Sequence, residues 1–339
     1  MYSIISELLI DRWNIKSKNC VELKKGSARC FVVSSEDERY FLKLYQDKFD
    51  WEKINNEILV CNYLCKRGYH VSEFIIDRDG RYIERINDRL CTLQKYIDGV
   101  TYYKFELIKK QLFESVKSLA NINIALEELP ISLPLRFDSQ SFVEWSSKMV
   151  IESYSNLLMK LDMQDKYYDK IANDFEKKKE MIDLFNPNLF PFDSLTFANS
   201  HGDYNVLQLI FGGSKVKAII DFSSCARLPV CWEIIRSYSL SSAECGKRII
   251  DMDNFTEYVK VYLKIKKLKK EDLELMPFFY LFSLLKSSFG YNNYIEKREK
   301  DILINDRDEE TLKFAFWRTD MAKWLFDNSE YLSLKLKNI

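Results

Sequence analysis

Two short segments of the 339-residue chain combine side chains that can do chemistry. The first reads SHGDYNVLQ over residues 200–208, and the second reads AIIDF over residues 218–222. They supply two carboxylates, Asp203 and Asp221, and the amide of Gln208. Phosphoryl transfer uses such a set, because one carboxylate orients and deprotonates an acceptor hydroxyl while other oxygen ligands hold magnesium on the phosphates. Isolated aspartates are usually turn or cap residues, so the interpretation depends on the two segments occurring together.

The two segments resemble the catalytic loop and the metal-binding loop of the aminoglycoside phosphotransferase and choline kinase superfamily. Its pattern is His-Gly-Asp-x-His-x-x-Asn, followed by Ile-Asp-Phe or Ile-Asp-Trp. The resemblance implies that Asp203 is the catalytic base and that Gln208 and Asp221 bind Mg²⁺. His201 would belong to the catalytic machinery because it orients the loop. The alternative is that His201 itself carries a proton. The offset of five from Asp203 to Gln208 equals that between the base and the metal-binding Asn of kinase catalytic loops.

Two residues depart from the family pattern, and both could weaken catalysis. Asn205 stands where the family usually has His, and Gln208 stands where it usually has Asn. Gln keeps the same amide oxygen on a longer arm and can still bind magnesium. The maltokinase branch of the superfamily also places Gln at this position. The change at Gln208 therefore indicates variation and not a dead enzyme.

An upstream segment, FLKLY over residues 41–45, resembles the third-strand lysine segment of kinases. The resemblance implies that Lys43 binds the α and β phosphates of a nucleotide and that Glu57, on the following helix, orients Lys43. Strand alternation places Lys43 on the same face as two aromatic residues, which suits a lysine that reaches into a cleft. A surface lysine is the alternative reading, and Glu52 and Glu84 are alternative partners.

Two further segments resemble the nucleotide-binding parts of the family. The turn GSAR at residues 26–29 has one glycine and no Gly-x-Gly-x-x-Gly, as in the reduced loops of this superfamily. The connector LQKYIDG at residues 93–99 resembles the hinge, where backbone groups meet the purine edge. Either ATP or GTP fits this reading. The implied nucleotide-binding residues, besides Lys43 and Glu57, are Gly26, Ser27, Gln94, Lys95, Tyr96 and Ile97.

The elements that must position these residues follow from periodicity. Short β-type runs separated by polar turns indicate an antiparallel meander in the first third of the chain. Asp50 is a plausible N-cap of one helix that ends at Gly68. The β-type runs cover residues 20–23, 30–34, 40–45, 73–76, 81–84 and 90–95.

Helical periodicity dominates the rest of the chain, apart from a strand-like patch at residues 206–222. The helical segments cover residues 105–126, 142–160, 167–185, 230–242, 255–264, 271–289 and 308–326. We expect an α+β, bilobal protein-kinase-like fold. Residues 1–95 would form a small lobe with an antiparallel sheet and one helix, and residues 96–100 a hinge. Residues 101–339 would form a larger, mainly helical lobe with the catalytic loop, the metal loop and the acceptor site.

Composition excludes several other classes of protein. The 51 basic residues balance the 51 acidic ones, so no overall field attracts nucleic acid or an anionic membrane. The eight cysteines include no Cys-x-x-Cys pair, which favours reduced thiols over a metal site. No leader-like N-terminus or stretch of about 18 apolar residues is present. We therefore expect a cytoplasmic protein.

The function predicted on these grounds is an ATP- or GTP-dependent O-phosphotransferase acting on a small-molecule hydroxyl. Aminoglycosides, other amino sugars, sugars and amino alcohols are the acceptors implied by the resemblance, and antibiotic resistance is one consequence of the first class. The alternative is a kinase-like protein without catalysis, which binds nucleotide or serves a structural role as in spore-coat relatives. A protein kinase is disfavoured, because His-Gly-Asp replaces His-Arg-Asp and no Ala-Pro-Glu segment follows Asp221. The oligomeric state is left open.

Overall fold

The fold was analysed in a computed structural model, which describes residues 2–23, 28–47, 49–137 and 147–339. The chain divides into two compact units. Unit 1 comprises Met1–Tyr103, Asn121–Pro134 and Asn199–Arg227. Unit 2 comprises Lys104–Ala120, Leu135–Ala198 and Leu228–Ile339. Three separate stretches of sequence therefore build unit 1, and both predicted chemical segments lie within it.

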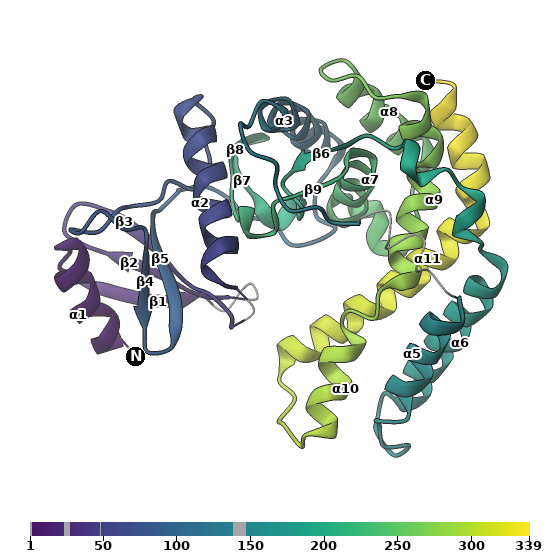
Figure 1. Cartoon of the computed structure of the whole chain (residues 1–339), viewed down its shortest axis with the longest axis horizontal. Coiled ribbons are helices and arrows are strands. Elements are labelled where there is room, and N and C mark those ends of the chain that lie inside the picture. The colour runs from purple at the N-terminus through teal and green to yellow at the C-terminus, as the bar shows by residue number, and fades with distance from the viewer. Residues whose placement is uncertain (1, 24–27, 48, 138–146) are drawn as a thin grey trace. The chain divides into compact units, whose positions relative to one another are not determined.

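Unit 1 contains a five-stranded antiparallel sheet with the strand order β1-β2-β3-β5-β4 (Figure 1). Strand alternation sends one set of side chains into a core beneath helix α1 (Tyr2–Trp13). Phe31, Leu42 and Leu93 are fully buried there. The opposite face carries Lys43. The strands are β1 (Asn19–Leu23), β2 (Arg29–Ser34), β3 (Arg39–Leu44), β4 (Ile83–Ile86) and β5 (Arg89–Lys95).

Helix α2 (Trp51–Lys66) follows β3, where the sequence predicted a helix. Asp50 caps it by accepting a hydrogen bond of 2.9 Å from the Lys53 N–H. Gly68 ends it with a φ of 80°, a conformation that glycine adopts without steric cost. The buried side of α2 is apolar except for Glu57, which is completely buried.

The third stretch of unit 1 contains the two chemical segments. Strand β6 (Phe197–Ser200) leads into residues 201–208, and the hairpin of β7 (Leu209–Gly212) and β8 (Lys215–Ile219) separates them from Asp221. The predicted strand-like patch is thus a hairpin. Strand β9 (Ala226–Pro229) follows and pairs with β6.

Long helices make up unit 2 (Figure 1). Helix α9 carries buried residues on all sides, so it is the core helix, and α11 packs along it. Helix α3 spans the boundary between the two units. The helices are α3 (Lys109–Glu127), α5 (Ser147–Leu158), α6 (Tyr168–Leu184), α7 (Val230–Ser241), α8 (Met252–Leu263), α9 (Lys270–Lys286), α10 (Tyr291–Glu299) and α11 (Asp306–Lys337).

The α+β, kinase-like fold predicted from the sequence is confirmed, with differences in detail. Helix α10 lies outside every helical segment predicted from the sequence. Helix α1 adds a second helix to the one expected beside the N-terminal sheet. The predicted strand at residues 73–76 forms no regular strand and makes only an isolated bridge, Phe74 with Gln94. Within the described ranges, no helix is both long enough and apolar enough to cross a bilayer.

Candidate active site

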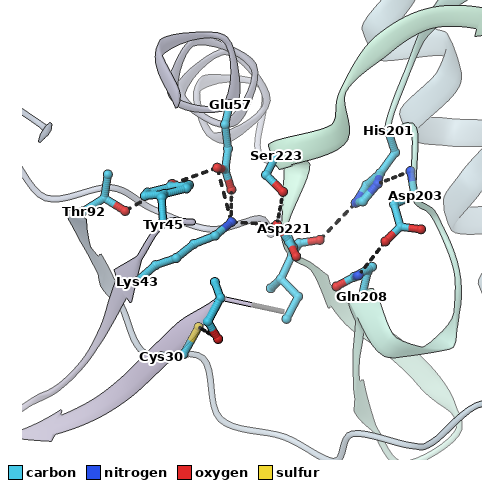
Figure 2. Close-up of polar contacts among 12 residues, drawn as sticks. Cys30, Lys43, Tyr45, Glu57, Thr92, His201, Asp203, Gln208, Asp221 and Ser223 are labelled. Carbon is cyan, nitrogen blue, oxygen red and sulfur yellow. Dashed lines mark hydrogen bonds and ion pairs between the residues drawn. The ribbon is translucent and has the colours of Figure 1, made fainter. Parts of the chain in front are cut away.

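The ammonium of Lys43 lies at the centre of a buried ionic network in unit 1 (Figure 2). Its Nζ is 2.9 Å from Glu57 Oε1 and 2.7 Å from Asp221 Oδ1. Lys43 is 5% exposed, so it is not a solvated surface lysine. Of the three carboxylates considered from sequence, Glu57 is the one that pairs with Lys43. Glu52 lies in the first turn of α2, and Glu84 pairs with Arg81.

Lys43 and Asp221 stabilise each other's charges. Burial alone would lower the pKa of Lys43, but the carboxylates of Asp221 and Glu57 raise it well above its usual value. Burial alone would raise the pKa of Asp221, but the Lys43 ammonium and a hydrogen bond from Ser223 lower it to about 2. Lys43 is therefore a cation and Asp221 an anion throughout the neutral range.

Tyr45, the residue directly after β3, supports the network. Its hydroxyl donates a 2.8 Å hydrogen bond to Glu57 Oε2 and lies 3.3 Å from the Thr92 hydroxyl. Tyr45 is almost completely buried, and the Lys43 ammonium lies 4.8 Å from its ring centroid. Sequence analysis missed Tyr45 as a functional residue, although its i+2 spacing from Lys43 on the same strand face was the available signal.

His201 links the catalytic loop to the metal loop. Its Nδ1 accepts a 3.3 Å hydrogen bond from the Asp203 N–H, and its Nε2 is 3.0 Å from the carbonyl of Ile220. Because Nδ1 accepts, the proton belongs on Nε2, which donates to Ile220. Both ring nitrogens are engaged with backbone and His201 is completely buried, which favours an orienting role.

Gly202 allows the catalytic loop to approach the metal loop. Its φ is +80°, and an added Cβ would lie 1.8 Å from the carbonyl oxygen of Ser224. No side chain fits at that distance, so steric exclusion explains why glycine occupies this position of the His-Gly-Asp segment.

Two amides hold the carboxylate of Asp203. Asn205 Nδ2 donates to the Asp203 carbonyl at 2.6 Å and to Oδ1 at 3.3 Å, and Gln208 Nε2 donates to Oδ2 at 3.1 Å. Asn205 also caps the short helical turn at Val206–Gln208 by accepting from the Leu207 N–H. The two residues that depart from the family pattern therefore both bind the candidate base.

Asp221 adopts a backbone conformation that is uncommon for a residue other than glycine. Its φ of 61° and ψ of 66° lie in the left-handed region, which costs on the order of 1–2 kcal/mol. The Ser223 hydroxyl donates a 2.6 Å hydrogen bond to Oδ1, the oxygen that also accepts from Lys43. Ser223 is a second residue that sequence analysis missed, because it forms part of the loop only through this turn.

The described oxygen atoms fit a magnesium ion. Because the amide nitrogen of Gln208 faces Asp203, the amide oxygen points away from Asp203, on the side of Asp221 (Figure 2). The Asp221 side chain is 38% exposed, and none of the described residues donates to its Oδ2. No group of three or more His, Cys, Asp or Glu among the described residues could hold a metal alone. Carboxylate and amide oxygens of this kind are ligands that Mg²⁺ accepts, together with water and phosphate oxygens.

The connector after β5 is attached on both sides. The Lys95 N–H donates to the Glu73 carbonyl at 2.9 Å, and the Tyr96 N–H donates to the Arg39 carbonyl at 3.1 Å. Among the described residues, none accepts from the N–H of Ile97. Gln94 lies in β5 and is 5% exposed. The remaining predicted nucleotide contacts, Gly26 and Ser27, lie outside the described residues.

Comparison with known proteins places this geometry in a family. The sequence matches the phosphotransferase enzyme family over residues 22–254, which is more than half of the chain, and the chain belongs to that family. As a member it is a phosphotransferase of the small-molecule kinase class with an alcohol group as acceptor, which confirms the predicted enzyme class. A search of curated protein sequences gave no significant match.

Solved structures share the fold across nearly the whole chain. An amicoumacin kinase has a TM-score of 0.63 at 11% identity, covering 95% of this chain and 93% of its own. A spectinomycin phosphotransferase has a TM-score of 0.63 at 13% identity, with coverages of 99% and 98%. A microcompartment-associated aminopropanol kinase has a TM-score of 0.62 at 13% identity, with coverages of 97% and 99%. At these identities the likeness establishes the fold.

Proposed function

We propose that the protein transfers the terminal phosphoryl group of ATP or GTP to a hydroxyl of a small molecule, with Mg²⁺ as cofactor. The observation that carries the proposal is that one compact unit holds both the Lys43–Glu57–Asp221 network and the Asp203–Gln208 pair. Amicoumacin kinase and spectinomycin phosphotransferase were solved with AMP-PNP and with ADP, respectively, which supports a nucleotide co-substrate here.

Lys43, Glu57 and the connector would bind the nucleotide. The Lys43 ammonium, held in place by Glu57, binds the α and β phosphates, and the backbone of residues 94–97 meets the purine edge. Asp221 and the amide oxygen of Gln208 would hold magnesium. When bound, the metal neutralises charge on the phosphates during transfer. Catalysis then consists mainly of positioning and electrostatic stabilisation.

Asp203 would act on the acceptor. Its carboxylate, held by Asn205 and Gln208, orients the acceptor hydroxyl and takes its proton as the oxygen attacks the terminal phosphorus. A new bond forms between that oxygen and phosphorus, and the bond to the leaving nucleoside diphosphate breaks. His201 keeps the loop in register by its two backbone hydrogen bonds.

The acceptor belongs to the hydroxyl-bearing small molecules. Three acidic residues of unit 2 with the charge to attract an aminoglycoside already have structural roles. Asp251 caps α8, Asp253 pairs with Lys335, and Asp308 pairs with Lys297 while capping α11. The related folds include an aminopropanol kinase, so amino alcohols belong in the same test as sugars and amino sugars. The eight free thiols suit a reducing compartment such as the cytoplasm.

Magnesium-dependent nucleotide turnover tests this function. ATP and GTP are each supplied with a panel of aminoglycosides, sugars and amino alcohols, using wild type, Asp203→Asn and Asp88→Asn. The control residue Asp88 lies exposed in the β4–β5 turn. We expect one acceptor class to stimulate nucleotide turnover by wild type. The stimulated rate should fall by at least about 100-fold in Asp203→Asn. It should be unchanged in Asp88→Asn. Nucleotide binding without turnover on any acceptor would favour the non-catalytic binding protein.

A further inference from the structure

The two carboxylate oxygens of Asp221 have different partners. Oδ1 accepts hydrogen bonds of 2.6 Å from the Ser223 hydroxyl and 2.7 Å from the Lys43 ammonium (Figure 2). A carboxylate oxygen has two lone pairs, so these two donors occupy Oδ1. None of the described residues donates to Oδ2. Oδ2 is therefore the oxygen of Asp221 that a metal ion can reach without displacing a protein donor.

Contacts other than the hydroxyl fix the position of Ser223. Residues Phe222–Ser224 form one short helical turn, which the Cys225 N–H closes with a 2.9 Å hydrogen bond to the Phe222 carbonyl. Phe222 is completely buried, and its ring centroid lies 4.4 Å from that of His201. The hydroxyl of Ser223 thus reaches Oδ1 from a turn that is anchored elsewhere. Removing this hydroxyl should leave the turn folded.

We propose that Ser223 selects the metal ion, because its hydroxyl keeps Asp221 a ligand through Oδ2 alone. The proposal rests on the proposed function, in which Asp221 binds the metal and Lys43 binds the phosphates. Ser223 touches neither the metal nor the nucleotide in this role. It determines metal specificity through the carboxylate that it holds.

Ser223 is the donor that remains on Oδ1 when a nucleotide binds. The Lys43 ammonium has three N–H groups, and it already meets Glu57 at 2.9 Å as well as Asp221. Phosphate oxygens compete with Asp221 for these groups. The Ser223 hydroxyl has a single proton, which it donates to Asp221. Because Ser223 lies two residues from Asp221 on the same turn, it follows the carboxylate wherever the turn moves.

A carboxylate restricted to one oxygen favours Mg²⁺ over Ca²⁺. Mg²⁺ demands a near-ideal octahedron of ligands, whereas Ca²⁺ takes more oxygen ligands at longer distances and accepts both oxygens of one carboxylate. A hydroxyl fixed on Oδ1 denies Ca²⁺ the second oxygen and takes no ligand from Mg²⁺. Ser223→Ala frees a lone pair of Oδ1, so Ca²⁺ should gain relative to Mg²⁺.

Nucleotide binding with each metal tests the proposal without requiring the acceptor. AMP-PNP and GMP-PNP are titrated into wild type, Ser223→Ala and Ser223→Thr by calorimetry, with either Mg²⁺ or Ca²⁺ in excess. Thr keeps the hydroxyl that Ala removes. The quantity compared is the ratio of the Kd with Ca²⁺ to the Kd with Mg²⁺. Comparing this ratio between variants cancels the different affinities of the two ions for the free nucleotide.

Ser224→Ala is the matched control. Ser224 lies in the same turn, and none of the described residues forms a hydrogen bond with its hydroxyl. The substitution leaves its backbone carbonyl in place. Thermal unfolding of each variant checks that it is folded.

We expect the ratio to fall about five- to tenfold in Ser223→Ala, the effect of one hydrogen bond to a charged group. Ser223→Thr and Ser224→Ala should keep the wild-type ratio. An unchanged ratio in Ser223→Ala, or an equal fall in Ser223→Thr or Ser224→Ala, would overturn the proposal while leaving nucleotide binding intact. Wild type that binds neither nucleotide, or that binds without needing a metal, would instead overturn the proposed function and this proposal with it.

Discussion

At the scale of single residues, the hydroxyl of Tyr45 affects the charge of Glu57. Burial raises the pKa of Glu57, while Lys43 and the hydrogen bonds from Lys43 and Tyr45 lower it. Glu57 Oε2 is the carboxylate oxygen farther from Lys43, 3.3 Å from the Lys43 Nζ. The Tyr45 hydroxyl donates a 2.8 Å hydrogen bond to this oxygen. The hydroxyl therefore favours the ionised carboxylate that Lys43 requires as a partner.

Replacing Tyr45 by Phe should shift the pH dependence of turnover. Without the donated hydrogen bond the pKa of Glu57 rises, so Glu57 takes up a proton at a higher pH than in wild type. The acid limb of the kcat/KM profile should then move to higher pH, and the nucleotide KM should rise about five- to tenfold at neutral pH. The measurement is the pH profile of kcat/KM for wild type and for Tyr45→Phe.

Tyr40→Phe is the matched control for this prediction. Tyr40 lies in β3, the strand that ends just before Tyr45, and donates a 2.8 Å hydrogen bond to Glu38, but this contact is exposed. Its loss should leave the acid limb in place. Coincident profiles for Tyr45→Phe and wild type would show that Tyr45 only fills the core.

Sequence reasoning found the site residues that lie in recognisable segments and missed two hydroxyl residues, Tyr45 and Ser223. Lys43, Asp203, Gln208 and Asp221 lie in segments whose spacing carries information. The roles of Tyr45 and Ser223 depend on where a hydroxyl points after the chain has folded. Ser223 contacts Asp221 only because Asp221 turns through a left-handed conformation, and no spacing rule specifies that turn.

At the scale of elements, the site depends on how closely the two loops approach. The catalytic loop crosses the metal loop at Gly202, and the hairpin β7–β8 fixes the distance between them along the chain. Periodicity predicted most strands and most helices, but not α1 or α10. It missed the role of residues 71–74, because Val71 bridges to Ile219 and Phe74 to Gln94, and such distant partners leave no local pattern.

Gly202→Ala tests whether this close approach holds the site together. The added Cβ would lie 1.8 Å from the Ser224 carbonyl oxygen at a φ of +80°, so the two loops must separate. We expect a loss of stability of about 2 kcal/mol or more, with turnover reduced by at least about 100-fold. Denaturant unfolding and steady-state rates measure the two effects.

Gly80→Ala separates the backbone conformation from the clash. Gly80 has almost the same φ, +79°, but an added Cβ there meets no atom within 4 Å. It should cost only about 1 kcal/mol and leave turnover unchanged. If Gly202→Ala and Gly80→Ala lost the same stability and turnover, the backbone conformation of the glycine alone would explain the effect. The close contact between the loops would then contribute nothing to stability or catalysis.

At the scale of the whole molecule, stretches that lie far apart in the sequence belong to the same compact unit. Residues 199–227 follow long helices in the sequence, yet they belong to the same compact unit as the N-terminal sheet. The lobe boundary at residues 96–100, drawn where the strand-like pattern gives way to helical periodicity, stays a prediction. Contacts such as Val100 with Phe211 join the connector to the hairpin, and a linear reading of the chain contains no sign of them.

This grouping predicts where nucleotide should change the protein. All described residues proposed to bind nucleotide and magnesium lie in unit 1, so ordering by the bound ligand should be concentrated there. In amide hydrogen exchange, Mg²⁺ and ATP should slow exchange in β3, α2, the connector and residues 201–223, with helices α9 and α11 little changed. In the variant Asp221→Asn, which removes a metal ligand, the protection of residues 201–223 should be lost. Part of the protection of the connector should remain. Protection confined to the helices of unit 2 would mean that nucleotide binds elsewhere, and the roles proposed for Lys43 and Asp221 would then be wrong.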